Sequence, residues 1–411
     1  MKLLVIGAGI GQVPIIEKAK ARGLYVITVS QKGNYPGLAL ADQVFECDIF
    51  DKERIVAYAR EQKIGAVISD QNDLMNPTVA YVAEKLGLPG NTYAQVMAYC
   101  NKNTYKDNCD LLGIPAPQHI AVDSENFDPA SFACPLPWIV KPADSQSSIG
   151  VTRVDTLEAL KPALRGALQA SRSRSAIVEQ FCNWQEVVCE GFIENGKFHL
   201  LAFADRKYFG LKDLMIPSQT LFPSVADPAL LEQVLACETA MAKYVNPAFG
   251  IVHAEYLIDP QTRQIRAVES ALRGGGVYIS SHLIPYATGI DINDVLLDKA
   301  LGIENDLQSV LAQRQEKAAG YVCFYLPEGI VQSIEGVDTL GQLPFVKKAC
   351  LENIQAGQDS EPMLHKGLRK GPILVTGENR AQLEENIQKV QNTLRITVRD
   401  GQGNISGIRW A

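Results

Sequence analysis

The sequence predicts an α/β protein that opens with a parallel β-sheet and continues into a mixed α+β region. Two observations support this fold class. Over the first ninety residues, short apolar strand patterns alternate with helical patterns, which is typical of a doubly wound sheet. From about residue 176 to residue 270, longer strand patterns follow one another and end in a hairpin. The 411 residues are enough for two to four domains with ample core.

Composition excludes several classes of partner. The formal net charge of −7 argues against a nucleic-acid partner and against an anionic membrane surface. Nine cysteines without a CxxC pair favour a reducing compartment over a disulfide framework, so we expect a cytoplasmic protein. The apolar start before Gly7 is short and leads into a turn, so it is interpreted as a first strand rather than a signal peptide. No apolar run approaches the roughly 18 residues that a membrane span needs.

The first sheet is expected to contain four strands joined by helices. The predicted strands are residues 2–6, 25–30, 44–47 and 66–69, and the predicted helices are residues 13–22, 52–62 and 77–86. In such sheets ligands lie at the carboxyl ends of the strands. Asp73, in the segment Gln71-Asn72-Asp73, follows the fourth strand at that edge. We therefore list Asp73 among the candidate substrate-binding residues.

The glycine turn after the first strand allows three interpretations. The pattern around Gly9 is GxGxG rather than GxGxxG, and the second strand ends in Ser30 where NAD binding would require an acidic residue. An NAD oxidoreductase is therefore disfavoured. The turn could instead accept another anion, such as a carboxylate, at the following helix N-terminus. A tight strand–helix turn without any ligand is about as plausible.

The middle of the chain carries features typical of a phosphate site. A helix is expected from Asn101 to Leu112, and a strand over residues 137–142 ends near Lys141. The loop that follows is rich in hydroxyl residues and ends in Gly150. A lysine beside a flexible loop of hydroxyls and backbone N–H groups can hold phosphates. Further strands are expected over residues 176–182, 186–192 and 198–203.

The predicted hairpin of residues 250–259 and 264–270 carries one carboxylate on each strand, Glu255 and Glu269. A five-residue loop, residues 260–264, would place them directly opposite each other, whereas a four-residue loop would send them to opposite faces. Facing like charges destabilise a sheet unless something bridges them, and Mg²⁺ is a natural bridge. The alternative is a surface hairpin with two solvated glutamates that bind no ligand. Arg273 and the glycines after it, which let backbone approach a ligand, follow at once.

The order of these features resembles the ATP-grasp superfamily. Lys102, Lys141 with its serine–glycine loop, the strand ending at Glu179 to Phe181, and the later carboxylates and arginine occur in the family's order. The resemblance implies a pre-ATP-grasp α/β domain over residues 1–95 and an ATP-grasp domain over residues 96–312, with a mobile lid at about 115–183. Residues 313–411 resemble the C-terminal domain of L-amino-acid ligases.

The resemblance also implies roles for individual residues. Lys102 and Lys141 resemble the lysines that contact ATP phosphates, and Arg273 resembles the arginine that steadies the transferred phosphate. The nucleotide set is completed by the mobile-loop residues Ser147, Ser148 and Gly150, the hinge residues Glu179, Gln180, Phe181 and Cys182, and the ribose acid Glu186. Glu255 and Glu269 resemble the ligands of Mg²⁺ or Mn²⁺. Weaker substrate-binding candidates are Gly9, Asp73, Arg206, Arg273, Gly274 and Gly275.

Two departures concern the metal site and the loop. The family pattern Glu-x-Asn-x-Arg has Ala271 in place of asparagine, so a second ion would be held more loosely, by water, or by Ser270. Ser147 replaces a common glycine. His253, on the strand of Glu255, is expected to be a core or supporting histidine rather than a catalytic one.

The resemblance implies an ATP-dependent carboxylate–amine ligase. It would form an amide or peptide bond through an acyl phosphate, releasing ADP and phosphate, with an amino acid or small carboxylate as substrate. The alternatives are a bicarbonate-using carboxylase or carbamoyl-phosphate-synthase-like enzyme, and a non-catalytic ATP-binding protein. The expected partners are small molecules, with a possible homodimer by analogy.

Overall fold

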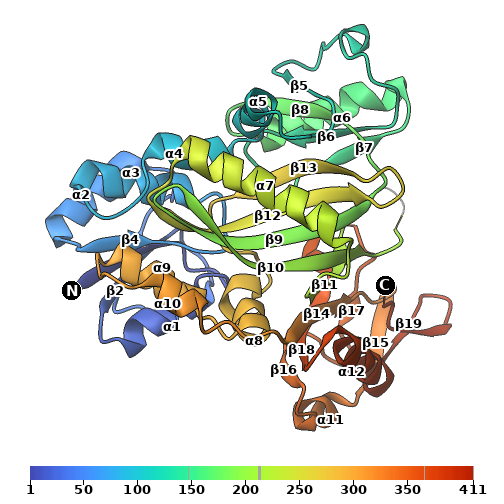
Figure 1. The fold of residues 1–411 in the computed structure, drawn as a ribbon. Coiled ribbons are helices and arrows are strands. Elements are labelled where there is room, and N and C mark those ends of the chain that lie inside the picture. Colours follow the sequence, from blue (N-terminus) through green and yellow to red (C-terminus); the bar gives the residue numbers. More distant parts are fainter. Residues whose placement is uncertain (147, 212–213, 365, 411) are drawn as a thin grey trace.

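The structure is a computed structural model that describes residues 1–146, 148–211, 214–364 and 366–410. Within these residues the strands form three four-stranded sheets and one eight-stranded sheet. In Figure 1 the N-terminal sheet, the small sheet of residues 119–180 and the C-terminal strands surround the green and yellow strands of the large sheet. The predicted fold class, a parallel N-terminal sheet followed by α+β regions, is confirmed.

The N-terminal sheet is parallel and has the strand order β3-β2-β1-β4. Its strands are β1 (Lys2–Ile6), β2 (Tyr25–Ser30), β3 (Gln43–Glu46) and β4 (Ala66–Ile68), and its helices are α1 (Val13–Ala21), α2 (Lys52–Gln62) and α3 (Asn76–Leu86). These bounds agree with the predicted ones to within a residue. Because the winding direction reverses between β1 and β4, the carboxyl ends of these strands form the usual ligand edge.

Two short helices lead from this sheet to the site. The helix α4 (Tyr93–Cys100), which was not predicted, starts with a capping box between Thr92 and Gln95. Asn101 has an extended backbone, which ends α4, and its side chain accepts a hydrogen bond from the Thr104 N–H to start α5 (Lys102–Leu112). This cap fixes Lys102 as the first residue of α5.

The small sheet has the antiparallel order β5-β8-β6-β7. It consists of β5 (His119–Val122), β6 (Trp138–Pro142), β7 (Thr152–Val154) and β8 (Ala176–Gln180), with the short helix η2 (Pro129–Ser131) before β6. The helix α6 (Leu157–Ala170) covers one face, where Leu164 packs with Trp138, Val140 and Val178. This unit forms the upper lobe of Figure 1.

The large sheet has the order β13-β12-β9-β10-β11-β14-β18-β16. Its strands are β9 (Gln185–Glu194), β10 (Lys197–Tyr208), β11 (Pro217–Phe222), β12 (Phe249–Asp259), β13 (Gln264–Ala271), β14 (Ala318–Phe324), β16 (Val346–Ala349) and β18 (Lys370–Gly377). Strand β11 pairs with β14, so the sheet continues across the predicted domain boundary at residues 312–313. The division into three domains remains a prediction.

The C-terminal sheet has the order β17-β15-β19-β20 and packs with two helices. Its elements are β15 (Gly329–Glu335), α11 (Val337–Gln342), β17 (Asp359–Ser360), α12 (Arg380–Thr393), β19 (Arg395–Arg399) and β20 (Ile405–Gly407). The remaining elements are η1 (Pro36–Ala39), α7 (Pro228–Val245), η3 (Ile279–Leu283), α8 (Ile284–Thr288), α9 (Ile292–Ala300), α10 (Leu307–Leu311) and η4 (Lys366–Leu368).

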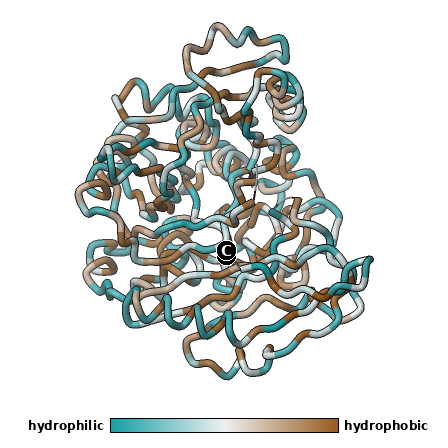
Figure 2. The backbone as a smooth tube through the Cα atoms, turned by 90° about the vertical axis from the view of Figure 1, so that its right-hand side faces the viewer, coloured by the Kyte–Doolittle hydropathy of each residue, from teal (hydrophilic) through white to brown (hydrophobic). Residues whose placement is uncertain are grey.

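Apolar residues are distributed in short stretches over these sheets. Figure 2 shows hydrophobic stretches separated by hydrophilic ones along the tube, as expected when many short strands each bury one or two faces. Among the described residues, no helix combines the length and the hydrophobicity that crossing a membrane requires.

A buried carboxyl supports the hairpin β12–β13 from behind. Glu238 of α7 has no exposed surface, and it accepts hydrogen bonds from the Tyr256 hydroxyl (2.7 Å) and the Ser270 hydroxyl (3.0 Å). Tyr256 and Ser270 each lie next in sequence to one of the predicted metal ligands. Burial raises the pKa of Glu238 to about 7.

We predict that Glu238→Gln makes stability less dependent on pH. The carboxyl has a higher pKa in the folded state than in the unfolded state, so the wild type loses stability as pH rises from about 4.5 to about 7. Glutamine does not ionise and avoids that loss. Between pH 5 and pH 8, the unfolding free energy of the variant should gain about 2 kcal/mol relative to the wild type.

Urea unfolding at several pH values measures this difference. The matched substitution Glu232→Gln, at an exposed position of α7, should leave the pH profile close to that of the wild type. Parallel profiles for Glu238→Gln and the wild type would contradict the prediction.

Candidate active site

The two hairpin glutamates lie directly opposite each other, although the loop is shorter than the length expected to produce that pairing. The loop between β12 and β13 has four residues, 260–263, and Asp259 pairs with Gln264. The register then shifts between Glu255 and Tyr256, so that Tyr256 pairs with Ala267 and Glu255 pairs with Glu269. A β-bulge at Val268 therefore restores the alignment. The expected pairing is confirmed, but the five-residue loop expected to cause it is wrong.

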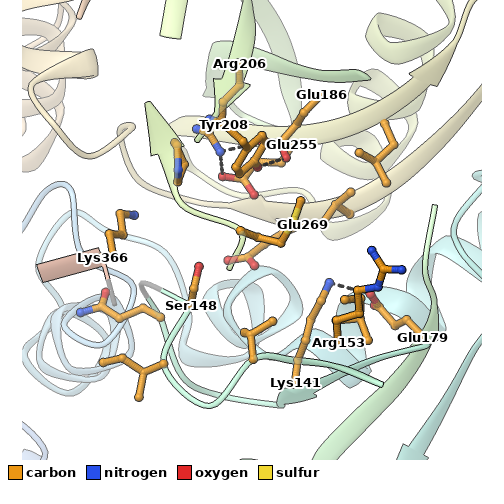
Figure 3. Close-up of a pocket in the computed structure, with 18 of the residues that line it drawn as sticks. Lys141, Ser148, Arg153, Glu179, Glu186, Arg206, Tyr208, Glu255, Glu269 and Lys366 are labelled. Atoms are coloured by element: carbon orange, nitrogen blue, oxygen red, sulfur yellow. Dashed lines mark hydrogen bonds and ion pairs between the residues drawn. The ribbon is translucent and has the colours of Figure 1, made fainter. Parts of the chain in front are cut away.

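This hairpin forms one wall of a cavity of about 850 Å³ between the large sheet and the small sheet. Figure 3 shows Lys141 and Glu179 on one side and Arg206, Glu186 and Glu255 on the other, with Glu269 between them. Of the predicted site residues, those lining the cavity are Asp73, Lys102, Lys141, Ser148, Glu179, Gln180, Phe181, Cys182, Glu186, Arg206, Glu255, Glu269 and Arg273. Residues from separate segments of the chain, from Asp73 to Arg273, thus meet in one place.

Arg206 of β10 holds the carboxylates around Glu255. Its Nη1 donates to Glu186 Oε1 at 2.7 Å and also to Glu255 Oε1, and its Nη2 lies 3.2 Å from His253 Nε2. The second oxygen of Glu186 accepts a hydrogen bond from the Tyr208 hydroxyl. Burial raises the pKa of Glu186. Burial also acts to raise the pKa of Glu255, but the positive charge of Arg206 outweighs it and holds that pKa well below its usual range.

His253 contacts the site rather than lying apart from it. Its Nδ1 is bonded to the buried Glu190, and its Nε2 lies 3.3 Å from Glu255 Oε1. Burial works against a charged imidazole, but Glu190 raises the pKa of His253. The histidine therefore contacts Glu255 from the side of Glu190, and its supporting role remains a prediction.

Lys141 of β6 and Glu179 of β8 form an ion pair on the face of the small sheet that borders the cavity. Lys141 Nζ lies 2.6 Å from Glu179 Oε2, and the fully buried Lys106 lies 3.4 Å from Glu179 Oε1. Lys106 also donates to the Ala267 carbonyl of β13 at 2.5 Å. Burial alone would raise the pKa of Glu179, but the two lysines lower it to about 2. The ammonium of Lys106 therefore links the small sheet to the hairpin.

Lys102 bridges Glu269 and the loop after β6. Its Nζ lies 3.3 Å from Glu269 Oε2 and donates to the Ser145 carbonyl at 2.9 Å, while its own N–H donates to the Ala143 carbonyl. Burial works against its charge, but Glu269 and Asp73 raise the pKa of Lys102. The predicted phosphate lysine is therefore positioned by the loop that was expected to close over the phosphates.

Arg273 forms a two-pronged ion pair with the N-terminal sheet edge. Its Nε and Nη2 donate to the two carboxylate oxygens of Asp73 at 3.0 and 2.6 Å. Although burial disfavours the charged carboxylate, Arg273 holds the pKa of Asp73 below its usual range. Asp73 thus lies in the cavity, where the sequence placed it, and it also fixes the arginine.

The glycine run packs against protein groups. The Gly274 N–H donates to the buried Asp70 at 2.8 Å, and a Cβ on Gly274 would come within 2.7 Å of that carboxylate. Asp70 also accepts from Ser280 (2.8 Å) and Asn293 (3.1 Å). A Cβ on Gly275 would lie 2.6 Å from Glu190. Close approach to these side chains therefore explains both glycines without a ligand.

In the glycine turn of the N-terminal sheet, protein groups likewise take the place that a ligand could occupy. The Gly9 N–H donates to Gln12 Oε1 at 3.0 Å, and Gln12 Nε2 donates to the Asp70 carbonyl at 2.6 Å. Among the described lining residues of the large cavity, Gly9, Gly150, Gly274 and Gly275 are absent. Ser147 lies outside the described residues.

Several cavity residues were not predicted. Arg153 lies 4.3 Å from the centre of the Phe181 ring, and Tyr208, Tyr321 and Lys366 also line the cavity. Lys106 supports it from behind. Only Tyr208, two residues after Arg206 on one strand, had a usable sequence signal, since alternation places both on the same face.

The residues present fit a divalent cation shared with a ligand. Glu255 and Glu269 line the cavity opposite each other, and among the described residues nothing bonds to Glu255 Oε2 or Glu269 Oε1. The described residues contain no cluster of three or more His, Cys, Asp or Glu side chains suited to a metal. Two carboxylates without a closed cage leave positions for substrate oxygens, as Mg²⁺ sites commonly do.

The suggestion that Ser270 could replace the missing asparagine is wrong. Ser270 is fully buried and its hydroxyl donates to Glu238 on the far side of the hairpin. The next residue, Ala271, is also buried and offers no oxygen in its side chain. Neither side chain can reach a cation held by Glu269.

Comparisons with known proteins agree with this geometry. Residues 110–208 match the family described as D-ala D-ala ligase C-terminus, and residues 322–399 match the L-amino acid ligase C-terminal domain 2. The crystal structure of an L-amino acid ligase from Bacillus licheniformis superposes with a TM-score of 0.82 at 20% identity, covering 97% of this chain and 99% of that one.

Curated relatives are similar over different lengths. A D-alanine–D-alanine ligase of Parabacteroides distasonis is 29% identical over 188 residues, covering 42% of this chain and 52% of that protein. The alanine–anticapsin ligase of Bacillus subtilis is 22% identical over 392 residues, covering 84% of this chain and 80% of that protein. The chain spans about half the length of the first curated relatives it matches.

In its fold, in its site and in the two segments that family models match, this chain resembles the ATP-grasp superfamily. Within the superfamily, it is similar to L-amino acid ligases over nearly its whole length and in its C-terminal region. The expected resemblance is confirmed.

We predict that Glu179→Gln destabilises the protein strongly. The change leaves Lys106 buried and Lys141 mostly buried without their carboxylate, and breaking a buried pair in this way costs about 3–5 kcal/mol. Urea unfolding measures the loss. The control Glu125→Gln removes the exposed ion pair with Arg165 and should change stability by less than about 1 kcal/mol. Equal effects of the two substitutions would contradict the prediction.

Proposed function

We propose that the protein is an ATP-dependent carboxylate–amine ligase that forms an amide or peptide bond and releases ADP and phosphate. The observation that carries the proposal is the meeting of Lys102, Lys141, Arg206 and Arg273 with the paired carboxylates Glu255 and Glu269 in one cavity. Such an arrangement matches the charge distribution of a phosphoryl transfer. Amino acids are the proposed substrates, because the C-terminal region matches an L-amino acid ligase domain.

The nucleotide is proposed to lie along the small sheet. The segment Glu179–Cys182 lines the cavity and would contact the adenine through its backbone, with the apolar side chains of Ile139, Leu257 and Met215 nearby in the lining. Lys141 and Lys102 would then face the phosphates. Glu186 is proposed to accept hydrogen bonds from the ribose hydroxyls. To do so, it would give up its hydrogen bond with Arg206 or with Tyr208.

The chemistry proposed for this chain has two steps. A substrate carboxylate oxygen attacks the γ-phosphorus and ADP leaves, giving an acyl phosphate. The amine nitrogen then attacks the acyl carbon; the C–N bond forms as the bond to the phosphate oxygen breaks, and the proton that the nitrogen loses leaves with the released phosphate. Lys102, Lys141 and Arg273 would balance the negative charge of the transferring group. Mg²⁺ or Mn²⁺, when bound by Glu255 and Glu269, would supply further positive charge at the phosphate oxygens.

Water must be kept away from the acyl phosphate. The loop of residues 144–150 borders the cavity through Ser145, Gln146, Ser148 and Ile149, and we propose that it closes over the phosphates. The lid of about residues 115–183, which contains the small sheet, would move with it. All nine cysteines are free, which supports the proposed cytoplasmic setting. The homodimer remains a prediction.

The decisive experiment measures ADP and phosphate release from ATP and Mg²⁺ with pooled amino acids and other small carboxylates. We expect release that requires a particular acid and rises when an amine is added. Stimulation by bicarbonate alone would favour a carboxylase-like reaction instead. ATP binding without release in any pool would favour a non-catalytic ATP-binding protein.

We predict that Lys141→Met and Glu269→Gln each reduce the acid-dependent ADP release by at least about a hundredfold, because each removes charge that the transferring phosphoryl group requires. Steady-state assays of the full chain measure the loss, and circular dichroism checks that the fold is kept. Lys161→Met, on the exposed surface of α6, is the control and should retain activity. Near-normal turnover in either cavity variant would refute the assignment of that residue.

A further inference from the structure

Lys366 brings a cationic side chain from the C-terminal region into the cavity. It begins the short helix η4, four residues before strand β18, and it lines the cavity together with Tyr321 of β14. Arg369 anchors this segment: its Nη1 donates to the Pro217 carbonyl at 2.6 Å, and its guanidinium lies 5.7 Å from the Tyr321 ring centre. The position of Lys366 is therefore set by strands of the large sheet.

Among the residues that the structure describes, Lys366 differs from the other cations of the cavity in having no counter-ion. Lys102, Lys141, Arg153, Arg206 and Arg273 each form an ion pair with a carboxylate. Within the described ranges, the Lys366 ammonium has no ion pair and no hydrogen bond. An ammonium that is largely removed from water without an anion is costly, so an anionic ligand would stabilise the bound state.

Lys366 lies at the end of the cavity opposite Glu179, and this end, the acceptor end, is left for the second substrate when the nucleotide lies along the small sheet as proposed. The charged groups that act on it most strongly are Arg369, Arg206, Glu255 and Arg273. Figure 3 shows Lys366 at the left of the view, Lys141 below and just right of the centre, and Glu179 at the right. Burial and the neighbouring arginines lower the pKa of Lys366 to about 8, so most of it remains charged at neutral pH.

We propose that Lys366 binds the carboxylate of the amine-bearing substrate, so that the second substrate is an amino acid and not a simple amine. This inference rests on the proposed ligase function. Lys102, Lys141 and Arg273 already face the transferring phosphoryl group, whereas a second amino acid brings its own carboxylate into a cavity that holds Glu255 and Glu269. That carboxylate would be repelled unless a cation at the acceptor end received it.

The test compares amino acids with their α-amides as second substrates for the wild type and Lys366→Met. The α-amide keeps the amine and the side chain but lacks the negative charge. We expect Lys366→Met to raise the KM for the amino acid by about tenfold or more, with kcat and the KM for the α-amide and for ATP near the wild-type values. Lys366→Arg should restore much of the preference for the amino acid.

Hydroxylamine trapping separates this proposal from the ligase function. With ATP and the acid alone, hydroxylamine converts an acyl phosphate into a hydroxamate, which reports the first step without any second substrate. If the wild type makes no hydroxamate with any acid, both the ligase function and the role of Lys366 are overturned. If Lys366→Met forms hydroxamate normally and its preference for the amino acid over the amide is unchanged, only the role of Lys366 is overturned.

A role in phosphate binding gives a third pattern. Lys366→Met would then slow hydroxamate formation and would affect amino acids and amides equally, which would overturn the proposal. Lys347→Met, on the exposed part of β16, is the matched control for removing a lysine from the C-terminal region. It should leave the KM values for both second substrates unchanged.

Discussion

The site depends on holding two carboxylates face to face on neighbouring strands. The bulge at Val268 aligns Glu255 with Glu269, and facing like charges would push a bare hairpin apart. The protein offsets this repulsion with cations from other elements, Arg206 of β10 and Lys102 of α5. The rest of the fold brings these cations to the hairpin while leaving one oxygen of each carboxylate open to a ligand.

Charged contacts also connect the three parts of the chain around this hairpin. Asp73 and Asp70, at the carboxyl edge of the N-terminal sheet, bond to Arg273 and to the Gly274 N–H. Lys106 joins the hairpin to Glu179 of the small sheet. Because these contacts converge on the hairpin, a movement of the N-terminal sheet or of the small sheet would shift the paired carboxylates. Distant sheets thereby set the geometry of one cavity.

Sequence patterns predicted the parts of the fold governed by local rules. The N-terminal strands and helices have nearly the predicted bounds, since alternation of short apolar strands and helices is a strong local signal. Most of the predicted site residues line the cavity, but the hairpin register was assigned the wrong cause, because a bulge leaves no clear mark in the sequence. Sequence reasoning also misplaced Ser270, although alternation along β13 already turns it to the face opposite Glu269. Helix α4 was missed, although Thr92 and Gln95 form its capping box.

By itself, the sequence determined which charged residues the protein has, their order along the chain and the periodicity of the elements that carry them. Through the family resemblance that this order carries, those properties were enough to predict a nucleotide and metal site. The tertiary structure alone decided which charges meet. The pairing of Lys106 with Glu179, the filling of the Gly9 turn by Gln12, and the entry of Lys366 into the cavity join residues far apart in sequence or depend on exact side-chain direction. Long-range packing fixes such contacts, and no local pattern encodes them.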